Sequence, residues 1–423
     1  MNILLCGADG FLGRAIASRL ETAGHWIVRG VHRIRQAGDI ALDYQRDLTP
    51  ETWLPRLQGV DAVINAVGIL REATPGDFER VHHRAPAALF QACAQAGIRR
   101  VIQISAVGPT ALTSYLASKH AADAALLQHL SEGATVLRPT LIFGEDGASS
   151  RFFLALASLP FLFVPQGIGK VQPVHIDDLT AAVEKTLGVP ERLESDPAPS
   201  RILDFPGPRA QTYGEWLEGY RKLMGLSSAL HIPVPAFVMA ATARLAGCFS
   251  RSLLCRDTWT MLAQGNVAEA GAASAFLDRP LRDPADFAAP KAAEGLRLRA
   301  FAFWRHPLLL GTLAAIWLLT ALLSAGIFPI EQSLALLAPF GLHGKAALFT
   351  LMAASGLDAA MGFLTLLRPG RRLFAFQLAL VLFYSLSIAW RLPEFLSHPF
   401  APVLKNLAIA ALLFQLIAEE KTP

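Results

Sequence analysis

Tyr115 and Lys119 are side chains whose types and spacing suit acid–base chemistry. Residues four positions apart share one face of a helix, so a helix here would place the phenol beside the ammonium. A free tyrosine has a pKa of about 10 and exchanges its proton poorly at neutral pH. A neighbouring ammonium stabilises the phenolate and lowers that pKa, as hydride transfer to or from a carbonyl carbon requires. Because the same spacing also occurs on ordinary surface helices, its meaning depends on the elements around it.

A glycine triplet near the amino terminus suits the binding of a phosphate. Gly7, Gly10 and Gly13 follow the apolar run 2–6 and precede a helical pattern. Gly7 permits a tight turn, Gly10 lets the backbone approach a pyrophosphate, and Gly13 allows the helix to pack closely on the strand. The helix N-terminus offers free N–H groups and a positive dipole end to the anion. The turn residues expected to bind a dinucleotide are Gly7, Asp9, Gly10, Phe11, Leu12 and Gly13.

Apolar runs typical of strands alternate with amphipathic stretches typical of helices in this half of the chain. The strand candidates are residues 2–6, 26–31, 62–67, 100–105 and 134–137, and the clearest amphipathic stretches are 86–96 and 118–130. Such alternation predicts a parallel sheet covered by helices on both faces. The expected fold class is therefore α/β, a doubly wound Rossmann domain.

The order of several motifs resembles the short-chain dehydrogenase/reductase superfamily, in its extended or atypical branch, over residues 1–290. These motifs are the GxxGxxG turn, Asp47-Leu48, Ala66-Val67-Gly68, the YxxxK pattern ending at Lys119, residues 137–144 around Pro139, and residues 174–179. The resemblance implies that Asp47 and Leu48 contact adenine and that the segment Ala66–Gly68 closes over the adenosine ribose. It also implies that Pro139 lies beside the nicotinamide and that Lys119 holds the nicotinamide ribose.

The end of the second strand bears on the choice of cofactor. An acid there would bind the ribose 2′-hydroxyl of NAD, whereas arginine accommodates the 2′-phosphate of NADP. The sequence has Arg33 and Arg35 at this point and no acid before Asp39. We therefore predict NADP(H), with Arg33 as the phosphate ligand and Arg35 as a second candidate. NAD(H) is the alternative, with residues 31–35 as a solvated basic loop.

By the resemblance, the hydroxyl of the third catalytic position either comes from Ser105 or is absent, with Ala106 in its place. Enzymes of the superfamily carry Ser-Ser or Ser-Thr here, and the second hydroxyl polarises the substrate carbonyl, but this chain has Ala106 after Ser105. Two functions therefore stay open. One is an oxidoreductase acting on a lipophilic carbonyl, alcohol or quinone-like substrate. The other is a non-catalytic NADPH-binding protein with an assembly or scaffolding role, similar to the reductase-like accessory subunit of respiratory complex I.

Residues 145–290 are expected to form the substrate side of the domain and a linker. The run 152–165 is apolar but too short to span a bilayer. It predicts a buried helix beside the substrate cleft or, alternatively, an element that admits a lipophilic substrate. Residues 233–250 could lie on a membrane surface. Residues 257–290 are rich in alanine, proline and acids and predict a loop or linker.

The C-terminal third, residues 291–423, is predicted to be a bundle of four transmembrane helices. The stretches 307–327, 346–367, 373–390 and 399–418 each approach the roughly 20 apolar residues that a span needs. Residues 398–406 resemble the opening of the last helix in DoxX-like membrane domains, from which no activity is carried over. Asp358 and Lys405 either pair within the bundle or leave Lys405 at the membrane interface.

Charge asymmetry predicts the orientation in the membrane. Basic residues on one side of the predicted spans are Lys291, Arg297, Arg299, Arg305, Arg368, Arg371, Arg372 and Lys421, against Lys345 and Arg391 on the other. The positive-inside rule then places both termini and the Rossmann domain in the cytoplasm, beneath the inner cell membrane.

The composition agrees with a membrane protein and argues against some other classes. Hydrophobic residues make up 53% of the chain and charged residues only 17%. A net charge of +4 without a basic block disfavours nucleic-acid binding. The cysteines form no CxxC pair and no metal-ligand spacing with histidine, so we expect reduced thiols and no metal site. The direct start of a strand after Met1 predicts no cleaved signal peptide.

Overall fold

The computed structural model describes residues 1–188, 199–248, 252–399 and 401–420 of the 423-residue chain. Lys421 and the end of the stretch 233–250, both used above, lie outside these ranges. The chain divides into two compact units, Met1–Ala300 and Phe301–Pro423, which we call unit 1 and unit 2. The division falls after Ala300 and not at residue 290 because Leu296 and Ala300 are buried among residues of unit 1.

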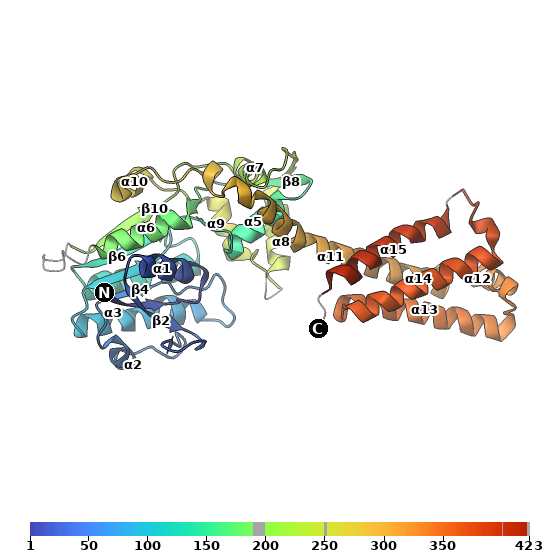
Figure 1. The fold of residues 1–423 in the computed structure, drawn as a ribbon, viewed down its shortest axis with the longest axis horizontal. Coiled ribbons are helices and arrows are strands. Elements are labelled where there is room, and N and C mark those ends of the chain that lie inside the picture. The colour runs from blue at the N-terminus through green and yellow to red at the C-terminus, as the bar shows by residue number, and fades with distance from the viewer. Residues whose placement is uncertain (189–198, 249–251, 400, 421–423) are drawn as a thin grey trace. The chain divides into compact units, whose positions relative to one another are not determined.

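In its described part, unit 1 contains a seven-stranded parallel sheet (Figure 1). The strand order β10-β6-β5-β4-β1-β2-β3 reverses beside β1 and creates the switch point where doubly wound sheets bind nucleotides. The predicted strands are confirmed with small shifts at their ends. Their bounds are β1 (Asn2–Cys6), β2 (Trp26–Val31), β3 (Ile40–Ala41), β4 (Ala62–Asn65), β5 (Arg100–Ile104), β6 (Ala134–Pro139) and β10 (Arg201–Phe205).

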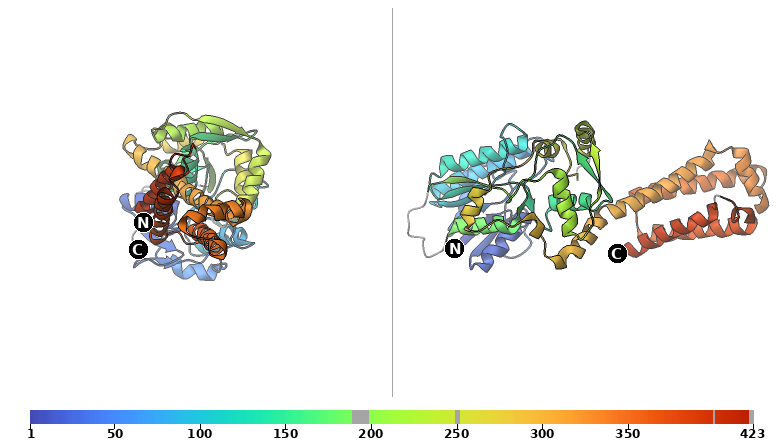
Figure 2. Two further views of the ribbon diagram at one scale, coloured as in Figure 1. Left: turned by 90° about the vertical axis from the view of Figure 1, so that its right-hand side faces the viewer. Right: turned by 90° about the horizontal axis from the view of Figure 1, so that it is seen from above.

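Helices cover both faces of this sheet (Figure 2), as predicted. Strand β1 shows why: Ile3 and Leu5 point into one core and Leu4 into the other, since side chains alternate along a strand. The helices α1 (Phe11–Thr22) and α6 (Ile176–Leu187) pack on the first core. The second core is covered by α2 (Pro50–Trp53), α3 (Ala85–Gln95) and α4 (Ser114–His129). The α/β Rossmann class is therefore confirmed.

The run 152–165 is not one buried helix, and that prediction is wrong. It divides between α5 (Ala148–Ala157) and the strand β8 (Phe161–Pro165), which pairs with β11 (Leu230–Val234). Pro160 interrupts the helical pattern, and the aromatic and β-branched residues after it favour a strand. The helix α7 (Tyr213–Leu223) packs with both elements around a third core.

The segment predicted as a loop or linker, residues 257–290, is mostly ordered structure. It contains α9 (Arg256–Gln264), α10 (Gly271–Leu277) and the 3₁₀ turn η4 (Pro284–Asp286), and α8 (Ala236–Ala246) precedes it. Three apolar side chains fix it to the body of unit 1: Trp259, Ala273 and Phe287 are buried. The Phe287 ring stacks on Phe143 with ring centroids 4.8 Å apart. Composition alone missed these contacts because they join residues distant in sequence.

Unit 2 contains the membrane helices. Four helices of the described residues are long and apolar enough to cross a membrane, as predicted. The first of them is followed by a short helix, α12 (Ile330–Leu337), which was not predicted from the sequence. The four long helices begin with α11 (Ala293–Leu322) and continue with α13 (Gly344–Leu367), α14 (Arg371–Arg391) and α15 (Pro402–Glu419).

Asp358 and Lys405 do not pair in unit 2. Asp358 is buried and lies beside Tyr384 on α14, whereas Lys405 is exposed. A second polar contact lies near by, where the Gln377 amide donates to the Thr365 hydroxyl at 2.9 Å. Of the two alternatives given for this pair, the structure has the one that leaves Lys405 on the surface of the bundle.

We predict that Arg221→Ala destabilises unit 1 strongly. The buried Arg221 guanidinium donates to the carbonyl oxygens of Ala157 (2.6 Å), Leu159 (2.7 Å) and Ser227 (2.8 Å). Removing it leaves the buried Ala157 carbonyl unpaired, at a cost of roughly 1–3 kcal/mol, and also takes the donor from Leu159 and Ser227. Thermal unfolding in detergent should show a clear loss for Arg221→Ala and almost none for the exposed neighbour Lys222→Ala. Equal midpoints for the two variants would contradict this role.

Candidate functional site

The glycine turn has the geometry of a phosphate cradle. Gly7 has a φ of +81°, and its N–H donates to the Gly30 carbonyl at 2.8 Å. Gly10 is the N-cap of α1 and no side chain caps that helix, so its first N–H groups remain open to an anion. A Cβ at Gly13 would lie 2.0 Å from the Gly7 oxygen. The turn therefore fits the pyrophosphate of a dinucleotide.

The segment after β4 lies against this turn, as the resemblance implies. A Cβ on Gly7 would meet Val67 Cγ2 at 3.1 Å and the Ala66 backbone at 3.3 Å. On the other side, a Cβ on Gly68 would meet Lys119 Nζ at 3.0 Å. The structure thus brings Ala66, Val67 and Gly68 between the glycine turn and the lysine of the YxxxK pair.

The segment after β6 approaches the start of α1. A Cβ on Gly144 would meet the Phe11 ring at 2.6 Å. Pro139 is buried at the end of β6, where its carbonyl accepts from the Val107 N–H at 3.0 Å. Asp9 and Leu12 are half-buried in or beside the turn, and the Asp9 carbonyl accepts from the Arg14 side chain.

Lys119 is a buried ammonium held by backbone oxygens. Its Nζ donates to the carbonyls of Val67 (3.1 Å), just after β4, and Ile104 (3.2 Å), at the end of β5. Burial lowers the pKa of Lys119 to about 8, while the nearby Asp123 opposes that shift. Lys119 therefore carries its charge at neutral pH and is held rigidly beside the predicted cofactor site.

The electrostatic effect predicted for Tyr115 is absent from this geometry. Burial raises the pKa of Tyr115 to about 12, so the phenol is protonated at neutral pH. Its ring packs edge-on against Phe78 and His82, with ring centroids 5.8 and 5.3 Å away. Among the described residues the Tyr115 hydroxyl has no hydrogen-bond partner. The hydroxyl is therefore free to bond a substrate oxygen.

His82 also lies in this site, although no functional role is predicted for it from the sequence. It lies in the π-helical turn η2 (Glu79–Arg84), a local distortion that is frequent at functional sites. Its Nε2 accepts from the Ile69 N–H at 3.0 Å, so Nδ1 carries the proton and donates to the Ser118 hydroxyl at 3.0 Å. Burial, and secondly the Lys119 charge, lower the pKa of His82 to about 2. His82 thus stays neutral and fixes the Tyr115–Lys119 helix from the side.

Ser105 is engaged elsewhere. Its hydroxyl donates to Asp123 at 2.8 Å, and Asp123 also accepts from Arg138 at 2.8 Å. All of this occurs in a buried network beneath the end of β5. The geometry therefore argues against Ser105 as the donor to a substrate carbonyl.

The residues predicted for the adenosine end lie along the edge of the sheet. The Asp47 carboxylate forms a two-point ion pair with Arg56 at 2.7 and 3.1 Å and also accepts from the Asp43 N–H. Leu48 is half-buried beside the core of that face. The adenine contact of this pair remains a prediction, since most of the carboxylate is already bonded.

Arg33 and Arg35 are exposed on the loop that follows β2. Asp39, the first acid of this region, accepts from the N–H groups of Arg35 and Gln36 at 3.0 and 3.3 Å. Asp39 also approaches the Arg29 guanidinium at 3.4 Å. The acid therefore shapes the loop and leaves the Arg33 side chain available to a phosphate.

A pocket of about 410 Å³ lies next to Phe78, which packs against Tyr115. Leu70, Phe78, Ala243 and Gly247 line it together with charged side chains, which are Arg71, Glu72, Arg244, Arg256 and Asp257. The pocket therefore lies between a neighbour of the predicted catalytic side chain and the substrate-side helix α8.

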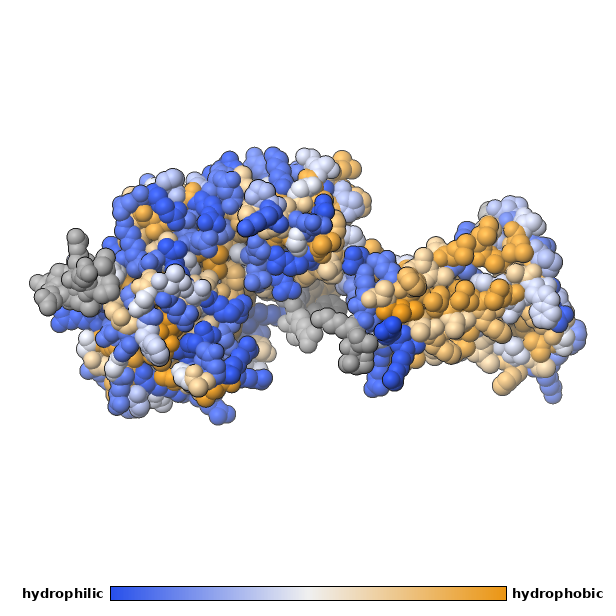
Figure 3. All heavy atoms as spheres, in the orientation of Figure 1, coloured by the Kyte–Doolittle hydropathy of each residue, from blue (hydrophilic) through white to orange (hydrophobic). Residues whose placement is uncertain are grey.

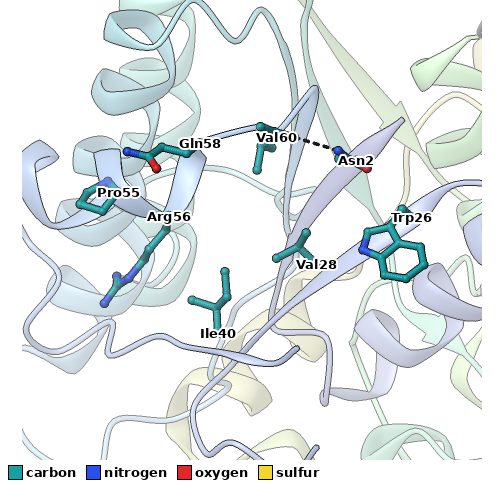
Figure 4. Close-up of a pocket in the computed structure, with 9 residues that line it drawn as sticks. Asn2, Trp26, Val28, Ile40, Pro55, Arg56, Gln58 and Val60 are labelled. Carbon is teal, nitrogen blue, oxygen red and sulfur yellow. Dashed lines mark hydrogen bonds between the residues drawn. The ribbon is translucent and has the colours of Figure 1, made fainter. Parts of the chain in front are cut away.

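A second cavity of about 570 Å³ lies near the amino ends of three strands of the sheet (Figure 4). It is lined by Asn2, Trp26 and Val60, at or just before the amino ends of β1, β2 and β4, and by Arg56 and Gln58. Nucleotides bind at the carboxyl ends of parallel strands. We therefore assign the cofactor to the glycine turn and not to this cavity.

Comparison with known proteins agrees with this geometry. Residues 3–196 match the NAD dependent epimerase/dehydratase family, and residues 314–414 match the DoxX-like family. The mouse protein "NADH dehydrogenase (ubiquinone) 1 alpha subcomplex subunit 9, mitochondrial" is 28% identical over 57% of this chain and 66% of its own length. "Ceramide reductase" of Caulobacter vibrioides is 29% identical over 42% of this chain and 58% of its own length. The chain thus spans less than two thirds of these relatives.

Solved structures share the fold of unit 1. MoeE5 in complex with UDP-glucose and NAD superposes with a TM-score of 0.51 at 19% identity, over 72% of this chain and 100% of its own. The human epimerase family protein SDR39U1 with NADPH has a TM-score of 0.51 at 18% identity, over 70% and 99%. At these identities the likeness shows the fold alone.

The fold and the two family matches define the class. The chain joins an NAD(P)-binding Rossmann domain of the epimerase/dehydratase and short-chain dehydrogenase/reductase kind to a DoxX-like membrane domain with four apolar helices.

We predict that Gly13→Ala weakens nucleotide binding at least tenfold. The added methyl would collide with the rigid backbone of Gly7, so the turn must shift out of its phosphate-binding shape. Titration of NADH and NADPH by fluorescence would measure the loss. Gly219→Ala is the matched control, because a Cβ there meets nothing within 4 Å. Unchanged affinity in Gly13→Ala would show that the turn does not hold the nucleotide.

Proposed function

We propose that this protein is a membrane-anchored, NADP(H)-dependent oxidoreductase that reduces a lipophilic carbonyl compound. The observation that carries the proposal is the position of Phe78, whose ring packs on Tyr115 and also lines the pocket beside α8. The apolar side chains of Leu70, Phe78 and Ala243 line the pocket together with charged side chains such as Arg71 and Arg244. A substrate there would meet both kinds of group and would contact Phe78, the neighbour of Tyr115.

At neutral pH the Tyr115 phenol carries the proton that the reduction of a carbonyl group consumes. When bound, the nicotinamide cofactor supplies the hydride. Tyr115 is protonated and gives its proton to the substrate oxygen as that oxygen becomes an alcohol. Lys119, charged below its pKa of about 8, would hold the nicotinamide ribose, since it has no electrostatic effect on Tyr115 in this geometry. The apolar packing by Phe78 and His82 keeps water from the phenol.

A lipid-like substrate is supported by two further points. The membrane domain keeps the site near a bilayer, where lipophilic molecules are concentrated. One relative is named a ceramide reductase, which suggests a long-chain lipid with a carbonyl group. The positive-inside rule, applied above, supports a cytoplasmic position for the site, where NADPH is available.

A second candidate function is favoured by the engagement of Ser105. With its hydroxyl donated to Asp123, the site lacks an identified side-chain donor for the substrate carbonyl. In that case the protein would hold NADPH as a structural element and bind a protein partner, as the match to a complex I subunit suggests. The purified protein, tested for absorbance change with long-chain ketones, isoprenoid aldehydes and quinones, distinguishes the two functions. Turnover of any of them supports the enzyme, and bound nucleotide without turnover favours the structural role.

We predict that Tyr115→Phe abolishes turnover without loss of cofactor. The variant keeps the ring packing against Phe78 but lacks the proton, so the rate should fall on the order of 10²–10⁴-fold. Steady-state kinetics and NADPH titration give the two quantities. Tyr213→Phe, at a buried tyrosine in a different core, serves as the control. Full activity in Tyr115→Phe would exclude Tyr115 as the acid.

We predict that Arg33→Ala weakens NADPH binding and leaves NADH binding unchanged. The exposed guanidinium would bond only the 2′-phosphate, and a hydrogen bond to a charged group contributes roughly 1.5–3 kcal/mol, about tenfold or more. Calorimetric titration with both nucleotides measures the ratio, and Arg35→Ala ranks the second candidate. The exposed Arg46→Ala is the control. Equal losses for both nucleotides, or a wild-type preference for NADH, would refute the assignment.

A further inference from the structure

The two-stranded sheet β8–β11 of unit 1 has an uncovered apolar face. In β8, Leu162 is buried, whereas its neighbours Phe161 and Phe163 are 42% and 45% exposed. Residues two apart in a strand share a face, so both phenylalanines point outward. In the parallel pairing, Leu230 and Ile232 of β11 stand opposite these two residues and share their face. The outer face of this small sheet is therefore made of aromatic and aliphatic side chains.

The helix α8 carries further exposed apolar side chains. It follows β11 directly after Pro235, and its Phe237 and Leu245 are 75% and 71% exposed. Phe237, Ala241 and Leu245 are spaced i, i+4, i+8 and so form one stripe along the helix. We call Phe161, Phe163, Leu230, Phe237, Val238 and Leu245 the apolar surface of unit 1. Figure 3 shows hydrophobic residues exposed over the β8 end of unit 1.

A surface of this kind is expected to be covered, because soluble proteins seldom expose large apolar patches. The start of the first membrane span indicates that a lipid bilayer covers it. Leu296 and Ala300, at the start of α11, are buried in the same core as Leu162 on the inner side of β8. The uncharged part of the first membrane span begins at Pro307, only seven residues after Ala300. Even fully extended, seven residues reach roughly 25 Å, so unit 1 always stays close to the bilayer.

The charges beside the apolar surface also suit a bilayer. Arg244 on α8 and Arg256 at the start of α9 are exposed, and both also line the pocket beside Phe78. Arginines at the edge of an apolar helix face bind the phosphates of lipid headgroups while the apolar side chains enter the acyl boundary.

We propose that unit 1 rests on the bilayer through this apolar surface, as a monotopic contact in addition to the membrane spans. The helix α8 then has two roles. Its outer stripe lies in the lipid interface, and its inner residues Ala243 and Gly247 line the pocket next to Phe78. The contact itself does not depend on the proposed function. That a lipophilic substrate reaches Tyr115 from the bilayer past α8 does rest on that function.

Nitroxide labels on the full-length protein in vesicles of phosphatidylcholine and phosphatidylglycerol test the contact. In a Cys248→Ser, Cys255→Ser background, single cysteines are introduced as Phe163→Cys and Phe237→Cys. Trp26→Cys, 73% exposed at the amino end of β2, is the aqueous control, and Phe349→Cys, 76% exposed on the span α13, is the lipid control. Oxygen concentrates in lipid, and a nickel chelate stays in water. We expect labels 163 and 237 to resemble label 349, with oxygen access exceeding nickel access.

Two other outcomes would overturn the proposal. Labels 163 and 237 with the nickel access of label 26 would show that the surface faces water. Low access to both reagents would show that protein covers it, such as a second copy of the chain. Neither outcome requires turnover, so failure of the lipid contact is distinguishable from failure of the proposed reaction. Label 349 verifies in each sample that the protein is inserted.

Discussion

The buried ammonium of Lys119 is the constraint on which the candidate site depends. A charge removed from water must be paired or solvated by dipoles, and here the carbonyls of Val67 and Ile104 do so. Ile104 ends β5 and Val67 follows two residues after the end of β4, so Lys119 ties the helix α4 to the carboxyl edge of the sheet. Gly68 leaves the space that the ammonium needs. Tyr115, one helical turn earlier, is thereby fixed against the same edge.

The same charge explains the state of its neighbours. His82 lies in a π-helical turn against α4, and both its burial and the Lys119 charge exclude an imidazolium. A neutral ring is then required, and the hydrogen bonds from Ile69 and to Ser118 select its tautomer. Burial thus shifts the pKa of His82, Tyr115 and Lys119, and the Lys119 charge adds to the shift at His82. Only the Tyr115 hydroxyl is left with an uncommitted proton.

The elements that sequence patterns predicted are those that depend on residues close together in the chain. The strand β1 and the glycine turn could be read directly, because a run of apolar residues followed by spaced glycines has few structural solutions. The membrane helices were equally readable, since length and apolarity suffice. The order of motifs also placed Tyr115 and Lys119 on one helix, which the structure confirms.

What could not be predicted depends on contacts between distant segments. Nothing local distinguishes Ser105 as a partner of Asp123, eighteen residues away, or His82 as a partner of Ser118. The prediction of one helix over residues 152–165 was wrong for a related reason. The second half of this run is a strand because β11, far along the chain, pairs with it. Likewise, the linker predicted before the membrane helices is held by Trp259 and Phe287, whose burial requires partners that composition does not reveal.

In the network of Ser105, Asp123 and Arg138, the Ser105 hydroxyl stabilises Asp123 and so is not available to bond a substrate. Asp123 is buried, and an unpaired carboxylate there would be costly, so it requires both the hydroxyl and the guanidinium. Turning the Ser105 hydroxyl toward a substrate would take one of those bonds away. In the proposed reduction, Tyr115 would therefore have to supply both the hydrogen bond and the proton. A substrate whose carbonyl is already polarised, or closely held by an apolar pocket, is the kind that one such donor can serve.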